Sequence, residues 1–209
     1  MKKSVLHILI GLILLSAGSQ RLSAQYALES FTFDTDIYSI RECCIPGFHY
    51  KYDDYLQYAP AALTIGLKAG GYDSRSSWGR MLVSDAFSAV IMTGAVNGLK
   101  YSVQRPRPDG SRNNSFPSGH TATAFMTATM LHKEYGWRSP WFSIGGYTAA
   151  AITGVSRIMN KKHWMTDIMA GAAIGIGSVH LGYFLTDRIF KDRGLDPSFS
   201  DPSFIYDLS

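Results

Sequence analysis

Two histidines of this sequence stand in short polar runs whose residue types could do nucleophilic or acid–base chemistry. His163 and Asp167 are four residues apart, which places both on one face of a helix and allows a hydrogen bond between them. A carboxylate bound to one imidazole nitrogen fixes the tautomer and leaves the other nitrogen able to attack an electrophile. Taken alone, the pair is also compatible with a purely structural helix start.

The second histidine, His120, follows a run that is typical of an anion-binding helix start. Ser118 is a suitable N-cap, and Gly119 allows a ligand to approach the backbone closely. Unpaired amide groups and the positive end of the helix dipole then favour a phosphate. Because N-capping serines are common, this run by itself predicts a helix start and no more.

Basic residues complete the set of groups that phosphate chemistry needs. Phosphoryl transfer requires positive charge around three equatorial oxygens, a nucleophile on one side and an acid on the other. The sequence supplies three such cations, Lys100, Arg107 and Arg157. Arg107 lies in a turn stiffened by prolines, which pre-positions its side chain. The sequence therefore predicts phosphoryl transfer at a site built from helix ends and connecting loops.

The three runs read Lys-x6-Arg-Pro, Pro-Ser-Gly-His and Ser-Arg-x5-His-x3-Asp, and together they resemble the motifs of the type 2 phosphatidic acid phosphatase family. The resemblance spans roughly residues 54–187. The family also includes bacterial class A acid phosphatases and vanadium haloperoxidases. One departure is the short gap of residues 109–116 between the first two motifs. Arg105-Pro106 repeats the Arg-Pro pattern; the spacing from Lys100 favours Arg107, with Arg105 as the alternative.

The resemblance implies a role for each residue of the motifs. His163 attacks phosphorus, Asp167 orients it, and His120 protonates the leaving oxygen and then activates water. Phosphate binding falls to Lys100, Arg107, Ser118, Gly119 and Arg157. No metal ion and no other cofactor is implied, because the cations take over a metal's electrostatic role.

The pattern of apolar residues predicts an all-α protein, a bundle of five or six helices. Strand signals are poor, no internal repeat is present, and Gly and Pro clusters separate the apolar segments. Gly171 and Gly175 have a spacing that permits close helix contact in lipid, which favours a membrane-associated bundle. A tightly packed soluble core is the alternative. The expected helices lie at about 55–69, 79–102, 119–135, 141–157 and 164–190.

The ends of the chain predict export. Residues 1–24 have the basic start, the apolar run and the small-residue end of a signal peptide, with an uncleaved anchor as the alternative. We therefore expect the protein on the periplasmic side of a bacterial membrane. The rest divides into an extended N-terminal lead-in at 25–54, a catalytic helical domain at 55–194 and an acidic tail at 195–209.

Charge and cysteine content limit the partners. The signal carries three of the positive charges behind the formal net charge of +4, so the sequence pI of 9.0 does not indicate nucleic-acid binding. Residues 56–194 hold 15 Lys and Arg against 7 Asp and Glu, which places an anion there. Cys43 and Cys44 are adjacent and too few for a disulfide framework, and no His/Cys spacing resembles a zinc site.

Three further runs resemble exported bacterial lipid phosphatases, with lipid A 4′-phosphatases as the nearest kind: residues 53–58, the turn Asp109-Gly110-Ser111 and Asn114-Ser115-Phe116. This implies an anionic phospholipid or lipid A-type substrate. Alternatives are an undecaprenyl-diphosphate or phosphatidylglycerophosphate phosphatase, and a soluble periplasmic acid phosphatase. A haloperoxidase fits poorly because nothing is added for halide chemistry. A protein that merely holds anionic lipid has no need of the His163–Asp167 pair, and the oligomeric state leaves no trace in the sequence.

Overall fold

The computed structural model describes residues 33–190 of the chain. The expected signal peptide and acidic tail lie outside the described residues. The chain divides into two compact units, Met1–Cys44 and Ile45–Ser209. The described part of the first unit is a helix at residues 33–44, so the expectation of an extended lead-in was wrong there. The mixed aromatic and acidic residues of this stretch show no clear helical period, so the sequence did not indicate this helix.

The second unit is a bundle of helices without a strand among its described residues, which confirms the predicted fold class. Most boundaries fall within two residues of those expected. The exception is the segment expected at 55–69, which breaks at Gln57 and Tyr58 because Pro60 then opens a new helix. The helices are α3 (Asp53–Leu56), α4 (Ala59–Ala69), α5 (Trp78–Val103), α6 (Gly119–Tyr135), α7 (Pro140–Met159) and α8 (Met165–Phe190).

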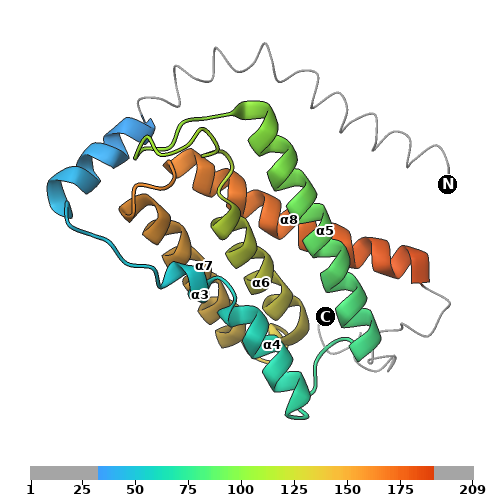
Figure 1. The fold of residues 1–209 in the computed structure, drawn as a ribbon. Helices are drawn as coiled ribbons and strands as arrows, with labels where there is room; N and C mark the ends of the chain where they lie inside the picture. The colour runs from blue at the N-terminus through green and yellow to red at the C-terminus, as the bar shows by residue number, and fades with distance from the viewer. Residues whose placement is uncertain (1–32, 191–209) are drawn as a thin grey trace. The chain divides into compact units, whose positions relative to one another are not determined.

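Helix α6 is the centre of this unit and contacts each of its other helices, as the ribbon in Figure 1 illustrates. Three helices begin at a serine whose side chain accepts a backbone N–H, the N-cap that short polar side chains provide. These are Ser77 before α5, Ser118 before α6 and Ser139 before α7. The predicted N-cap at Ser118 is thereby confirmed, and α6 starts where the candidate site needs it.

The start of α8 packs tightly on the start of α6 because glycines remove the side chains between them. A Cβ atom at Gly171 would lie 2.5 Å from the carbonyl oxygen of Ser118, and one at Gly175 would lie 2.3 Å from that of Ala122. The Ser118 N–H donates to the Asp167 carbonyl oxygen over 3.0 Å. The small-residue spacing noted in the sequence therefore holds the second and third motifs against each other.

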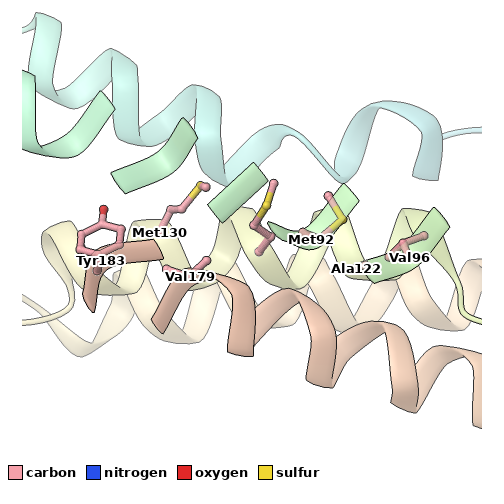
Figure 2. Close-up of a cluster of buried hydrophobic side chains, with 7 residues drawn as sticks. Met92, Val96, Ala122, Met130, Val179 and Tyr183 are labelled. Atoms are coloured by element: carbon pink, nitrogen blue, oxygen red, sulfur yellow. The ribbon is translucent and has the colours of Figure 1, made fainter. Parts of the chain in front are cut away.

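The apolar core is a narrow seam between α5, α6 and α8, built from methionine and small residues rather than from large aliphatic ones. Figure 2 shows these side chains meeting between the helices. Close packing of small side chains lets the helices approach, and methionine fills the irregular gaps that remain. The buried members are Met92, Val96, Ala122, Met126, Met130, Val179 and Tyr183.

Two of the described helices, α5 and α8, are long and apolar enough to cross a membrane. Only 22% of the most apolar stretch of α5 and 39% of that of α8 is buried within the protein. The core helix of a soluble protein would be mostly buried, whereas these helices present apolar side chains outward. Exposed examples are Leu82, Val90, Met169, Leu181 and Phe184.

Candidate active site

The three motifs meet at one end of the bundle. The end of α5, the 104–118 connection, the start of α6, the end of α7 and the start of α8 all lie there (Figure 1). Lys100 on α5 contacts the 104–118 connection directly. Its ammonium group donates to the carbonyl oxygens of Asn114 and Pro117, each over 2.8 Å. Lys100 thus ties the end of its helix to the connection that carries the second motif. One ammonium hydrogen remains for a ligand.

His163 is buried beside Asp167, yet its hydrogen bond goes elsewhere. Its Nδ1 atom lies 2.8 Å from the carbonyl oxygen of Ser115 and 3.6 Å from the Asp167 carboxylate. A carbonyl oxygen only accepts, so Nδ1 carries the proton and Nε2 keeps its lone pair. No hydrogen bond reaches Nε2 from the described residues. The expected close pair is present, but Ser115 rather than Asp167 fixes the tautomer.

The environment keeps His163 neutral. Burial, together with the nearby positive charges of Arg157 and Lys100, lowers its pKa to about 4, although Asp167 opposes this shift. A histidine with this pKa is unprotonated at neutral pH. An imidazole with one nitrogen bound and the other carrying a lone pair is the form that can act as a nucleophile.

Asp167 is fully buried and is surrounded by donors. Its carboxylate accepts from the Ser115 hydroxyl, from Arg105 over 2.9 Å and from the Trp164 backbone N–H over 2.9 Å. Since Ser115 also holds His163, the carboxylate acts on the histidine partly through this serine. Sequence reasoning missed Ser115 as a site residue, because a backbone carbonyl acceptor leaves no mark on the sequence.

The two Arg-Pro arginines have different partners. Arg105 bonds to Asp167 and to the Thr166 hydroxyl (2.6 Å), and its guanidinium lies 5.5 Å from the centre of the Trp164 ring. Arg107 donates through Nε to the Asn114 side chain (3.0 Å), and within the described residues its two terminal nitrogens have no hydrogen-bond partner. Burial and the positive charge of Arg157 lower the pKa of Arg107. Arg107 is therefore the arginine with donors left for an anion.

Ser118 and Gly119 are placed differently with respect to a ligand. The Ser118 hydroxyl is buried and bonds to Thr121, through its hydroxyl (2.9 Å) and its backbone N–H (3.4 Å). It caps α6 in this structure, so a direct contact between this hydroxyl and phosphate stays a prediction. Gly119 is only partly buried, and it lines a cavity beside His120.

An acidic pair on α3, absent from our candidate list, contacts His120 and Arg157. The Asp54 carboxylate lies 2.9 Å from Nε2 of His120, and Asp53 accepts from Arg157 over 2.6 Å. Burial and Arg157 lower the pKa of His120, against the opposing effect of Asp54. The signal that could have found the pair is two adjacent acids opening a helix just before a basic region.

The ion pair between Arg157 and Asp53 is buried but incompletely satisfied. The side chains are 11% and 1% exposed. The Nε atom of Arg157 and one carboxylate oxygen of Asp53 have no hydrogen-bond partner within residues 33–190. Buried donors are costly to leave unpaired, so an additional acceptor at Nε would be favourable. A phosphate oxygen is an acceptor of this kind.

A cavity of about 480 Å³ lies beside His120 and is lined by residues of α3, α5 and α6 and of the link between α3 and α4. A second cavity of about 340 Å³ adjoins Lys100, and Asn97 lines both. The larger cavity combines apolar side chains with amide and hydroxyl groups. It offers room for a leaving group with both apolar and polar parts. Its lining residues besides Asn97 and His120 include Gln57, Tyr58, Met92, Thr93, Val96 and Thr123.

Comparison with known proteins defines the class of protein to which this fold and site correspond. Residues 81–191, which contain all three motifs, match the PAP2 superfamily, and the chain belongs to this superfamily. The predicted type 2 phosphatidic acid phosphatase relationship is thereby confirmed.

Among individual proteins, the chain is 50% identical over 167 residues to Lipid A 1-phosphatase of Porphyromonas gingivalis. The matched region covers 79% of this chain and 38% of that protein. It is 27% identical over 119 residues to Lipid A 4′-phosphatase of Helicobacter pylori, covering 52% of this chain and 57% of that one. Phosphatidylglycerophosphatase B of Bacillus subtilis is 28% identical over 130 residues, with 56% and 62% covered. The chain thus spans between 38% and 62% of the length of these relatives.

Two solved structures share the fold. Aquifex aeolicus LpxE superposes with a TM-score of 0.52 at 23% identity, over 69% of this chain and 92% of that one. The transmembrane PAP2 type phosphatidylglycerolphosphate phosphatase of Bacillus subtilis superposes with a TM-score of 0.54 at 22% identity, over 92% of this chain and all of that one. Both support the helical PAP2 architecture.

Proposed function

We propose that this protein is a metal-independent phosphatase that removes phosphate from a membrane lipid of the lipid A class, through a phosphohistidine on His163. The observation that carries the proposal is the state of His163. It is buried and neutral, its Nδ1–H is fixed by Ser115, and its Nε2 lone pair has no hydrogen-bond partner within the described residues.

In the first step of the proposed mechanism, Nε2 of His163 attacks phosphorus and the bond to the leaving oxygen breaks. His120 gives its proton to that oxygen. In the second step His120 takes a proton from water, the water oxygen attacks phosphorus, and the phosphorus–nitrogen bond breaks. Lys100, Arg107 and Arg157 neutralise the phosphate oxygens, which is where the charge of the transferring group is spread.

The charge of the site supports chemistry without a metal. The groups around the proposed phosphate position are an ammonium, two guanidiniums and the amide end of α6. Such a set attracts an anion and repels a divalent cation. Two of the nearby carboxylates are paired with arginines, Asp167 with Arg105 and Asp53 with Arg157.

The relatives support a lipid substrate, but they favour a different phosphate group of lipid A from the one that we expected. We expected a resemblance to lipid A 4′-phosphatases, but identity is higher to a lipid A 1-phosphatase, 50% against 27%. We therefore propose the 1-phosphate of a lipid A-type molecule as the substrate, with phosphatidylglycerophosphate as the second candidate because of the Bacillus subtilis relative.

Exposed aromatic residues support a location of the helical bundle within a membrane. Tyr55 and Tyr101 are exposed at the site end of the bundle, and Trp78 and Trp141 at the far end. Tyrosine and tryptophan favour the headgroup level, so two such levels suggest the two faces of a bilayer. Helix α5 runs between them with 26 residues, more than the roughly 20 needed to span the hydrocarbon. With the expected export signal, the site would face the periplasm.

A phosphate-release assay tests the function as a whole. We expect the purified protein in detergent, with excess chelator, to release phosphate from a lipid A bearing both phosphates, more slowly from phosphatidylglycerophosphate, and to be inhibited competitively by vanadate. Vanadate takes the five-coordinate geometry of the transferring group, and such mimics bind tightly. His163→Asn protein provides the background rate.

Each part of the proposal has its own contrary outcome in this assay. No release from any lipid or soluble ester would overturn the phosphatase. Release that stops with chelator and returns with Mg²⁺ would overturn the metal-free mechanism. Faster release from small soluble phosphomonoesters than from lipids would favour the acid phosphatase alternative.

A further inference from the structure

The side chain of Asp54 contacts the acid–base histidine and does not pack in the core. Its carboxylate lies 2.9 Å from Nε2 of His120 and 3.7 Å from a terminal nitrogen of Arg157. The Asp54 side chain is 48% exposed, and that of His120 is 33% exposed. A pair this exposed contributes little to stability.

The short helix α3 is anchored independently of Asp54. Asp53 is buried against Arg157, and the carbonyl oxygen of Gln57 accepts from the hydroxyl of Thr127 on α6 over 2.8 Å. Both anchors flank Asp54 in the chain. The backbone of Asp54 is therefore held in place from either side, and its carboxylate is presented to His120 from a fixed position.

The two histidines of the site are hydrogen-bonded through different ring nitrogens. His163 is bound at Nδ1 by the Ser115 carbonyl oxygen, which leaves Nε2 available. His120 is bound at Nε2 by Asp54, and within residues 33–190 no hydrogen bond reaches its Nδ1. Each histidine therefore has one ring nitrogen bound by the protein and the other left for the reaction.

We propose that Asp54 is a positioning residue for the proton-transfer steps. It accepts the Nε2–H of His120 and so makes Nδ1 the nitrogen that exchanges protons. When His120 is protonated, Nδ1–H passes to the leaving oxygen as its bond to phosphorus breaks. The Nδ1 lone pair then takes a proton from the attacking water, which restores the starting state. This inference rests on the proposed function and adds a second histidine–carboxylate pair to it.

The test compares two leaving groups. An alkyl leaving group such as the lipid needs a proton, whereas nitrophenolate leaves without one, so only the first depends on a general acid. We expect Asp54→Ala to lower kcat/KM on the lipid phosphate by about 10- to 100-fold, a part of the 10²–10⁴-fold that a general acid supplies. On nitrophenyl phosphate kcat/KM, which reports only the steps up to release of nitrophenolate, should fall by less than about threefold, whereas kcat can fall on both substrates because the second step uses His120 as a base. Asp54→Asn keeps an acceptor oxygen without the charge and should lie between parent and Asp54→Ala.

A double variant separates positioning from a merely structural role. If Asp54 acts through His120, then Asp54→Ala added to His120→Ala should cause no further loss on the lipid phosphate. Asp73→Asn is the matched control, because that carboxylate pairs with Arg138 over 2.6 Å at an exposed place outside the site. The control should keep both activities.

Equal losses of kcat/KM on the two substrates, or additive losses in the double variant, would overturn the role of Asp54. Should Asp54→Ala fail to fold, Asp54→Asn, with nearly the same shape, carries the same comparison. Absence of phosphate release by the parent protein would instead refute the proposed function, and activity of the parent together with a normal Asp54→Ala variant would refute only the inference.

Discussion

Replacing His163 with asparagine is expected to lower kcat/KM by at least about 10⁴-fold, the scale on which covalent catalysts lose activity without their nucleophile. The reason is the Nε2 lone pair, which the buried His163 presents and which an asparagine amide lacks. Asparagine retains an N–H donor for the Ser115 carbonyl oxygen, so the fold should persist. Steady-state phosphate release and a melting curve in detergent measure the two effects.

The matched control is His132→Asn, the same substitution on α6, at a histidine whose Nδ1 lies 2.7 Å from the Ser143 hydroxyl. It should retain parental activity. A His163→Asn protein that melts like the parent and keeps activity within about tenfold of it would remove His163 from the mechanism.

Replacing Arg157 with alanine is expected to cost both stability and activity. Arg157 is the partner of Asp53, which is fully buried, and removal of one member of a buried ion pair leaves a charge without compensation. Such losses typically destabilise by about 3–5 kcal/mol. The same change removes a cation that we assign to the phosphate. The free energy of unfolding, measured with a chemical denaturant, and the rate of phosphate release should therefore both fall.

A second substitution separates the two effects. Asp53→Asn in the Arg157→Ala background removes the stranded charge, so most of the lost stability should return while activity stays low. Arg157→Lys keeps the charge without the planar fork and should bind phosphate less well. An Arg157→Ala protein as stable as the parent would contradict the energetic argument, and a double variant that regains activity would contradict the assignment to phosphate.

Much of the bundle could be predicted because local signals mark its boundaries. Gly70 and Gly71, the proline-rich turn at 105–108 and Pro140 separate the helices, and Ser118 caps α6 as its residue type suggests. The motifs also define which side chains gather at one end. Residues 33–44 were not predicted as a helix, because their apolar residues show no clear helical period.

The contacts inside the site could not be predicted, because they join segments far apart in the sequence. The Ser115 carbonyl oxygen that fixes His163 is a backbone group, which any residue type provides. The spacing from Lys100 favoured Arg107 over Arg105 for the phosphate, but the contact between Arg105 and Asp167 could not be predicted from the sequence. Asp54 lies 66 residues before its partner His120.

The central claim, a covalent phosphohistidine, is tested most directly by trapping it. Protein mixed with radioactively labelled lipid phosphate and quenched in alkali within the first turnover should retain label that is stable to base and labile to acid. Peptide mapping should place the label on His163, and His163→Asn protein should retain none. With nitrophenyl phosphate, which forms the intermediate without an acid, His120→Ala protein should accumulate more label than the parent, because the water that breaks the intermediate loses its base. Turnover without any trapped label in either protein, or label on a different residue, would contradict the account.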